Sequence, residues 1–312
     1  PERQVLAERP VPVRVTVAQM RSVTPTVTGF GVVQPARTFE AIAQVGGIAE
    51  YVNPAMQKGA ILPKGSVLVR LSQADYNLAI AQARANIRAA EAKLAELTVT
   101  GQNLSAALSI ENEALTLKSA DLARAQTLFA GGTVSQAALD AARTAHLAQS
   151  QKVQGVESSI ALLPTQRSIQ SEQIALSQVN LDTALLNLGR TELTLPFAAR
   201  VSSVSVEVGQ FVRVGQTGAQ LDGIEAAEVE AQISVAHLRT LLQSAMPDVQ
   251  TLALDPSAMT DLIRGLDLKA TVSLRLGLDV LEWPASVDRI SETIDQITGM
   301  IGMIVRVDTP YS

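Results

Sequence analysis

The chain has 312 residues, of which 47% are apolar but only 3% aromatic, and its formal net charge is -5 at pH 7. This length allows two or more domains, and an apolar share made largely of Ala, Leu, Val and Ile favours long helices and simple sheets over aromatic-lined enzyme pockets. Acidic and basic residues are mixed along the chain, so we expect no nucleic-acid partner. The absence of cysteine excludes disulfides, thiolate nucleophiles and thiolate metal sites.

The first elements that we expect are short strands. Up to Leu71, valine-rich runs are separated by glycines, which is the pattern of strands and turns. The last of these runs reads GAILPKGSVLVRL, from Gly59 to Leu71, and VGGIAEYV supplies a further strand before it. A unit this short cannot bury a core by itself, so it must pack against something else.

A very long helix is predicted next. Between Ala74 and Phe129 there is no proline and a single glycine, and good helix formers dominate. Apolar residues recur every seven positions, which is typical of a coiled-coil seam, with companions three positions later. The seam positions are Ile80, Ile87, Leu94, Gly101, Leu108, Leu115, Leu122 and Phe129, and the companions are Ala83, Ala90, Leu97 and Leu104.

Two adjacent glycines, Gly131 and Gly132, then interrupt the helical pattern. They supply the backbone freedom that a reversal of direction needs, and Ser135 can cap the start of a return helix. The seven-residue spacing resumes, so the sequence predicts an antiparallel hairpin in which Gly101 lies opposite Arg167, with a kink or loosened seam at that level. The return positions are Leu139, His146, Val153, Ile160, Arg167, Ile174, Leu181 and Leu188.

A second glycine-rich motif follows the hairpin. GQFVRVGQTGAQL, from Gly209 to Leu221, repeats the spacing of the first motif, with glycines six apart and a leucine twelve after the first glycine. We expect the two copies to pack as halves of one small β-sandwich, with the hairpin inserted between them. AEVEAQISVAHLRTLL, from Ala227 to Leu242, then predicts a strand and a helix.

A split β motif with a long helical hairpin between its halves resembles the lipoyl domain of the HlyD-like membrane fusion proteins, the periplasmic adaptors of tripartite efflux pumps. The segment from Val23 to Gly47 is similar to the stretch that precedes that domain in the family. The segment from Ala227 to Leu242 is similar to the strand and helix of the family's β-barrel. The resemblance implies an elongated, multidomain α+β fold. Its domains would be a membrane-proximal β domain (1–22 and 283–312), a β-barrel (23–40 and 222–282), a lipoyl-like domain (41–71 and 192–221) and the hairpin (72–191).

The turn carries a second family feature. Members that dock onto an outer-membrane channel have an Arg, a Leu four residues later and a Ser eleven residues after the Arg, and Arg124, Leu128 and Ser135 reproduce that spacing. By resemblance these residues, with Gly131 and Gly132, form the docking tip, where Arg124 offers a planar donor fork to carbonyls or carboxylates. The plainer interpretation is a solvated arginine, a leucine beside the seam and an ordinary N-cap.

The resemblance implies a non-enzymatic adaptor that links an inner-membrane transporter of the resistance-nodulation-division (RND) type to an outer-membrane channel and so exports drugs or other small molecules. Copies would self-associate, as a hexamer in the assembled pump. The protein would lie in the periplasm, anchored to the inner membrane through an N-terminal segment that a chain starting at Pro1 lacks. We expect no cofactor, catalytic group or metal, since His146 and His237 are far apart and no paired carboxylates adjoin a base.

Two alternatives stay open. One is an adaptor of an ATP-driven exporter or a type I secretion system. The other is a biotin or lipoate carrier subunit, which the run from Pro54 to Lys58 superficially suggests. In carrier domains, however, the modified lysine lies between the two halves, where this chain has its hairpin, so we expect Lys58 to be a solvated turn residue.

Overall fold

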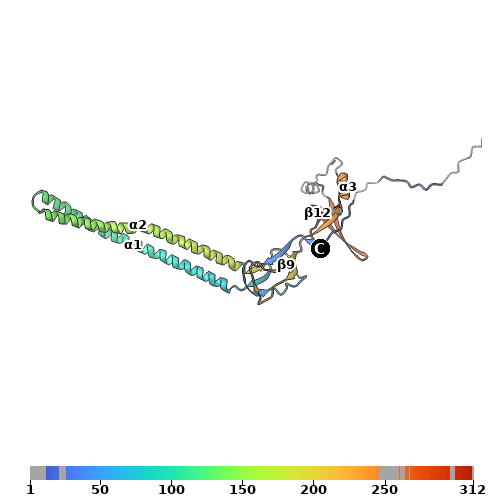
Figure 1. Cartoon of the computed structure of the whole chain (residues 1–312), viewed down its shortest axis with the longest axis horizontal. Coiled ribbons are helices and arrows are strands. Elements are labelled where there is room, and N and C mark those ends of the chain that lie inside the picture. The colour runs from blue at the N-terminus through green and yellow to red at the C-terminus, as the bar shows by residue number, and fades with distance from the viewer. Residues whose placement is uncertain are drawn as a thin grey trace, which may run out of the picture. The chain divides into compact units, whose positions relative to one another are not determined.

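The computed structural model describes residues 12–20, 26–245, 260, 264–266, 268–295 and 299–310. The chain divides into two compact units (Figure 1). One comprises Phe39–Asp222 and holds the hairpin with the sandwich at its base. The other combines Pro1–Thr38 with Gly223–Ser312.

The predicted sandwich is confirmed, and each of its two sheets mixes strands from both halves of the repeat. β4 of the first half pairs with β7 of the second, and β3 of the first pairs with β8 of the second. One sheet has the order β2 (Thr38–Ile42), β9 (Thr217–Gly223), β7 (Ala199–Val204), β4 (Ile61–Leu62). The other has the order β6 (Glu192–Thr194), β5 (Val67–Leu71), β3 (Gly47–Val52), β8 (Phe211–Val212).

The repeated glycines lock the two halves together. The amide of Gly59 donates to the carbonyl of Val201 at 2.8 Å, and the equivalent Gly209 donates to Ala49, also at 2.8 Å. Both glycines have a φ near +90° (90° and 87°), a conformation that strains residues with a Cβ. Because each glycine bonds to the opposite copy, neither copy completes its backbone pairing alone.

The hairpin is also confirmed. α1 (Ala74–Ala130) has 57 residues and α2 (Gln136–Gly189) has 54, so each arm is about 80 Å long at about 1.5 Å per residue. The two helices run side by side from the sandwich to the turn (Figure 1). Except for Phe129, the predicted seam positions are buried or half-buried. The most enclosed apolar side chains are Ile80, Ala83, Ala90, Leu139, Val153 and Leu163.

Polar side chains of α2 cross the seam to main-chain carbonyls of α1. Gln170 Nε2 donates to the Ala90 carbonyl at 3.0 Å, and Gln149 Nε2 donates to the Glu111 carbonyl at 3.0 Å. Gln149 is only 8% exposed, and a buried amide donor without a hydrogen-bond partner would lower the stability of the seam. The bonds to α1 carbonyls avoid that cost. They therefore help to fix the register of the hairpin.

Gly101 and Arg167 meet at the level where the sequence places them. A Cβ added to Gly101 would lie 2.8 Å from Arg167 Nη2 and 3.3 Å from Leu163 Cδ1. The same Nη2 is 3.4 Å from the Leu97 carbonyl, while Arg167 Nε is buried without a hydrogen-bond partner. The missing side chain at Gly101 thus makes room for a guanidinium in an apolar seam, and α2 continues through Pro164 beside it.

The base of the hairpin is tied to the sandwich through Thr191, which is 0% exposed. Its carbonyl accepts from the amide of Leu71 at 2.9 Å, and its hydroxyl accepts from Gln73 Nε2 at 3.0 Å. In the first turn of α1, the Tyr76 hydroxyl donates to the carbonyl of Gly46, just before β3, at 2.6 Å. Both arms are therefore anchored where they leave the β-strands.

The second unit is one antiparallel sheet with a helix, α3 (Val235–Ala245). Its order is β1 (Val33–Pro35), β10 (Ala227–Ser234), β13 (Met300–Val307), β12 (Asp279–Asp295), β11 (Lys269–Leu276). The sequence division at Trp283 falls inside β12, where Trp283 pairs with Val272, so β12 and β13 share one sheet with β10 and β11. Of the other predicted membrane-proximal residues, 12–20 form no helix or strand, and 1–11, 21–22, 296–298 and 311–312 lie outside the described residues.

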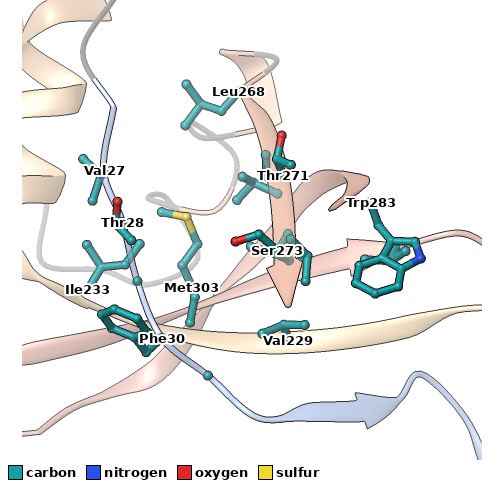
Figure 2. Close-up of a pocket in the computed structure, with 18 of the residues that line it drawn as sticks. Val27, Thr28, Phe30, Val229, Ile233, Leu268, Thr271, Ser273, Trp283 and Met303 are labelled. Atoms are coloured by element: carbon teal, nitrogen blue, oxygen red, sulfur yellow. The ribbon is translucent and has the colours of Figure 1, made fainter. Parts of the chain in front are cut away.

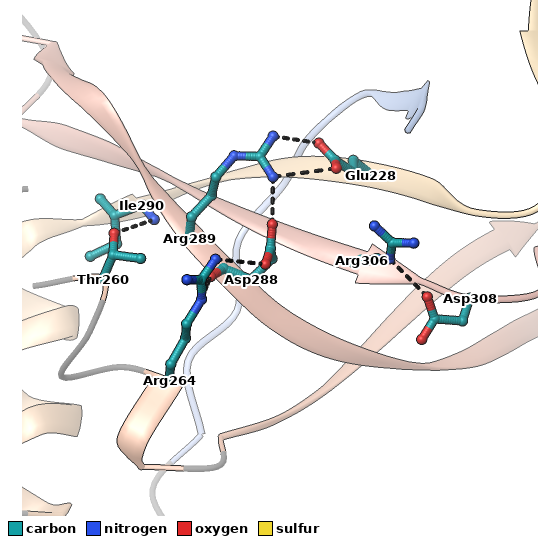
Figure 3. A network of polar contacts seen from close by, with 8 residues as sticks. All are labelled: Glu228, Thr260, Arg264, Asp288, Arg289, Ile290, Arg306 and Asp308. Atoms are coloured by element: carbon teal, nitrogen blue, oxygen red, sulfur yellow. Dashed lines mark hydrogen bonds and ion pairs between the residues drawn. The ribbon is translucent and has the colours of Figure 1, made fainter. Parts of the chain in front are cut away.

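A group of ion pairs joins residues of β10 and β12 in this sheet (Figure 3). Arg289 Nη2 lies 2.7 Å from Glu228 Oε2, and Asp288 accepts from Arg289 and from Arg264, the latter at 3.1 Å. Burial by itself raises the pKa of Asp288, but the hydrogen bonds and charges of the two guanidinium groups together lower the pKa below its usual value. The ionised carboxylate is thus favoured in the folded protein.

Two adjacent leucines test the seam. Leu163 is 7% exposed and Leu162 is 60% exposed. We predict that Leu163→Ala destabilises the hairpin by about 2–3 kcal/mol through the cavity it leaves, while Leu162→Ala costs less than about 0.5 kcal/mol. Urea unfolding followed by helical circular dichroism measures both, and equal losses would show that the seam does not run along this face.

Acid unfolding tests the Asp288 ion pairs. Because the pKa is lowered on folding, the stabilisation is present above the unfolded value of about 3.9 and is lost as the pH falls through the folded pKa. We predict that Asp288→Asn reduces stability at pH 7 by at most about 1 kcal/mol and flattens the loss below about pH 4. Fluorescence of the single tryptophan, Trp283, reports unfolding of this unit. Asp279→Asn, at an exposed carboxylate of the same strand, is the control.

Candidate docking site at the hairpin tip

The turn at the end of α1 is closed by backbone hydrogen bonds. The amide of Gly132 donates to the Phe129 carbonyl at 2.9 Å, and the amide of Thr133 donates to the Leu128 carbonyl at 2.9 Å. Gly132 has a φ of +73°, the left-handed conformation with which many helices end. These bonds satisfy carbonyls that the last helical turn leaves without partners, so the end of α1 has a defined geometry.

The two glycines at the turn have different roles. The sequence predicts the same role for both, but Gly131 has a φ of −81°, which any residue adopts. A Cβ at Gly131 would meet its nearest neighbour, the Leu128 carbonyl oxygen, at 3.6 Å, an ordinary contact. Only Gly132 therefore needs to be glycine on conformational grounds.

Ser135 caps the start of α2, as the sequence predicts. Its backbone is extended, with φ −74° and ψ 158°, and its hydroxyl accepts from the Ala138 amide at 3.3 Å. A hydroxyl in this position satisfies one of the free amides of the first turn. In the described structure the side chain is thus engaged within its own helix, where it sets the direction in which α2 leaves the turn.

Arg124 and Leu128 lie one helical turn apart on the last part of α1. The Arg124 side chain is 72% exposed, and its Nη1 is 3.5 Å from Asp121 Oδ1. An exposed pair of this kind holds a side chain only weakly, so the guanidinium can turn to a partner. Leu128 is 40% exposed, so part of its apolar surface is open to a partner.

Phe129 is a tip residue for which the seven-residue repeat predicts a place in the seam. That prediction was wrong, because Phe129 is 38% exposed. α1 ends one residue later and α2 begins only at Gln136, so Phe129 lies at the very end of the paired helices. Phe129 breaks no seven-residue pattern, and only its closeness to the glycines signals the exposure.

The tip therefore combines two exposed apolar side chains, Leu128 and Phe129, with an exposed cation, Arg124. Apolar contact plus a guanidinium that reaches carbonyls or carboxylates suits the recognition of a protein surface. Within the described residues, no cluster of three His, Cys, Asp or Glu is placed to hold a metal ion. Lys58 is exposed in a turn of the sandwich, next to the buried Met56.

A curated relative has a similar sequence. The chain is 28% identical over 193 residues to the multidrug resistance protein MdtN of Escherichia coli, which covers 56% of this chain and 54% of that protein. The matched region thus spans about half the length of the relative. No protein-family model matches the chain.

Solved structures share the fold. The membrane fusion protein Spr0693 of Streptococcus pneumoniae superposes with a TM-score of 0.54 at 13% identity, covering 90% of each chain. MacA of Actinobacillus actinomycetemcomitans gives a TM-score of 0.53 at 16% identity, covering 93% of this chain and 74% of that one. The chain therefore has the fold of the membrane fusion proteins, and the resemblance found in its sequence is confirmed. Among the described helices, none is both long and apolar enough to cross a bilayer.

The paired glycines give a test of the tip geometry. We predict that Gly132→Ala destabilises the turn by about 1–2 kcal/mol, because a Cβ is strained at positive φ, whereas Gly131→Ala is neutral within about 0.5 kcal/mol. Hydrogen exchange of the Thr133 and Ala138 amides measures local opening. Similar protection in both variants would contradict the assignment of the left-handed residue.

Proposed function

We propose that this chain is a periplasmic adaptor of an efflux pump, which links an inner-membrane transporter to an outer-membrane channel. The observation that carries this proposal is a stiff hairpin of two helices, each over 50 residues long, that presents an exposed tip far from its β-sandwich base. Likeness to a multidrug resistance protein and to membrane fusion proteins supports it. Such an arrangement spans a distance and encloses no reaction site, so the role that we propose is non-enzymatic.

The tip is the part that would meet the channel. Arg124, Leu128 and Ser135 have the spacing of channel-docking family members, and Arg124 and Leu128 are both exposed. In this proposal Arg124 and Leu128, joined by Phe129, make the contact. Ser135 and Gly132 act by fixing the shape of the turn.

Several copies would stand side by side, six in the assembled pump. Support comes from apolar side chains on the outer face of α2, which repeat at the seven-residue spacing of a helix–helix contact but lie outside the intrachain seam. Leu162, Ile169 and Leu176 are 60%, 65% and 55% exposed. An exposed stripe of this kind is typical of an interaction surface.

We place the adaptor in the periplasm, held at the inner membrane by a segment preceding Pro1, and assign it an RND-type transporter that exports drugs or other small molecules. An ATP-driven exporter or a type I secretion system is the second candidate. Purification of the tagged full-length protein from its native membranes, after cross-linking, identifies the bound transporter. Recovery of an RND transporter supports the first assignment, and recovery of an ATPase exporter overturns it.

Drug tolerance tests the tip. In a strain that lacks the chromosomal copy, we predict that Arg124→Ala abolishes complementation while the abundance and thermal unfolding of the protein are unchanged. Arg124→Lys keeps the charge but loses the donor fork, so it should restore tolerance only in part. Arg88→Ala removes an exposed arginine of the same helix about 54 Å away (about 1.5 Å per residue) and serves as control. Wild-type tolerance with Arg124→Ala would remove the docking role.

A further inference from the structure

The unit that contains α3 has a cavity of about 1130 Å³ that is partly open to solvent. Figure 2 shows the segment with Val27, Thr28 and Phe30 on one side of this space, and β11, with Thr271 and Ser273, on the other. Pockets for small molecules commonly measure about 300–1,000 Å³, so the cavity can hold a molecule of drug or single-chain-lipid size. It lies in a different unit from the hairpin tip.

The wall of the cavity is mostly apolar. On the inner face of the sheet, Val229, Ile233 and Met303 are each at most 8% exposed, and they give the cavity a fixed floor. At its rim, Phe30 is 83% exposed and Leu274 is 49% exposed. Apolar surface left in water costs about 25 cal/mol per Å², so a ligand with an apolar body would be stabilised here.

The polar groups of the cavity are few and uneven. Lys269 is the one charged side chain among the described residues that line it, and it stands at the start of β11. Hydroxyls come from Thr28, Thr271 and Ser273. An apolar wall with one cation and several hydroxyls suits a ligand that carries a single negative charge at one end.

We propose that this cavity binds an amphiphilic monoanion of low molecular mass, with its apolar body against the sheet and its anionic group near Lys269. This is an activity beyond the adaptor role, since linking two membrane proteins requires no ligand. Two sources have this chemistry: an exported aromatic acid, or a single-chain anionic lipid.

Trp283 makes binding measurable in the whole chain, because it is the only tryptophan and lines the cavity. The probe is 8-anilinonaphthalene-1-sulfonate, an aromatic monoanion whose absorption overlaps tryptophan emission. We expect saturable energy transfer from Trp283 to the bound probe. The neutral N-phenyl-1-naphthylamine, with the same ring system, should also bind but should not depend on the lysine.

Three variants locate the site. Ser273→Phe fills the cavity from β11 and should weaken binding of both probes at least about tenfold. Leu278→Phe adds the same ring at an exposed residue of the turn between β11 and β12 that does not line the cavity, and should bind like wild type. Lys269→Met should weaken the anionic probe about threefold or more and leave the neutral probe unchanged. Circular dichroism and the unfolding midpoint show that each variant is folded.

Displacement then identifies the source. Release of the anionic probe by nalidixate supports an exported aromatic acid, and release by palmitoleate supports a single-chain lipid. The absence of saturable transfer in the wild type overturns the proposal, as does wild-type affinity in folded Ser273→Phe. An unchanged affinity of the anionic probe in Lys269→Met overturns the assignment of the anionic group. None of these outcomes depends on drug tolerance, so the adaptor proposal is tested separately.

Discussion

The seam between α1 and α2 is the contact on which the position of the tip depends. The two arms have no globular core around them, so side chains that repeat every seven residues must supply the stabilisation. Each leucine-sized side chain buried there contributes about 1.5–3 kcal/mol, and many such levels offset the cost of ordering two helices of 57 and 54 residues. The seam therefore acts as a spacer that holds the tip away from the sandwich. Without the seam, the hydrogen bonds of the turn would fix the shape of the tip but not its position.

The sandwich holds both arms of the hairpin at their base. β5 leads directly into α1, and α2 leads into β6, while β5 and β6 pair with each other in the same sheet. The two arms therefore leave the sandwich from neighbouring strands, and buried Thr191 bonds to the residues at the start of the other arm. Because Gly59 and Gly209 each bond across to the other half, the halves cannot separate without releasing the base of the hairpin.

Some of these features could be read from the sequence because they rest on periodic or local rules. The seven-residue repeat predicts the seam, equal glycine spacing predicts the paired half-motifs, and a serine before a helical run predicts the cap at Ser135. The identity of the left-handed glycine could not be predicted, because Gly131 and Gly132 offer the same freedom and the hydrogen bonds decide between them. The exposure of Phe129 depends on where the helices end, which the repeat does not encode.

The second unit was harder to predict for a different reason. β12 is 17 residues long and shifts register between Val287 and Arg289 and again between Ile290 and Ile294. Such irregularities break the alternation from which strands are recognised, so the sequence division at Trp283 cut one continuous strand. The cavity is lined by residues from both ends of the chain, and no local pattern brings Phe30 and Ser273 to the same space.

Site-directed photo-cross-linking tests most directly that the seam holds a docking tip at the far end of the hairpin. Because the chain has no cysteine, Leu128→Cys at the tip and Leu78→Cys near the base each offer a single exposed site for a benzophenone maleimide. In reassembled pumps, we predict a cross-link from position 128 to the outer-membrane channel and none to the channel from position 78. A channel cross-link from position 78, or one from position 128 only to the inner-membrane transporter, would contradict it.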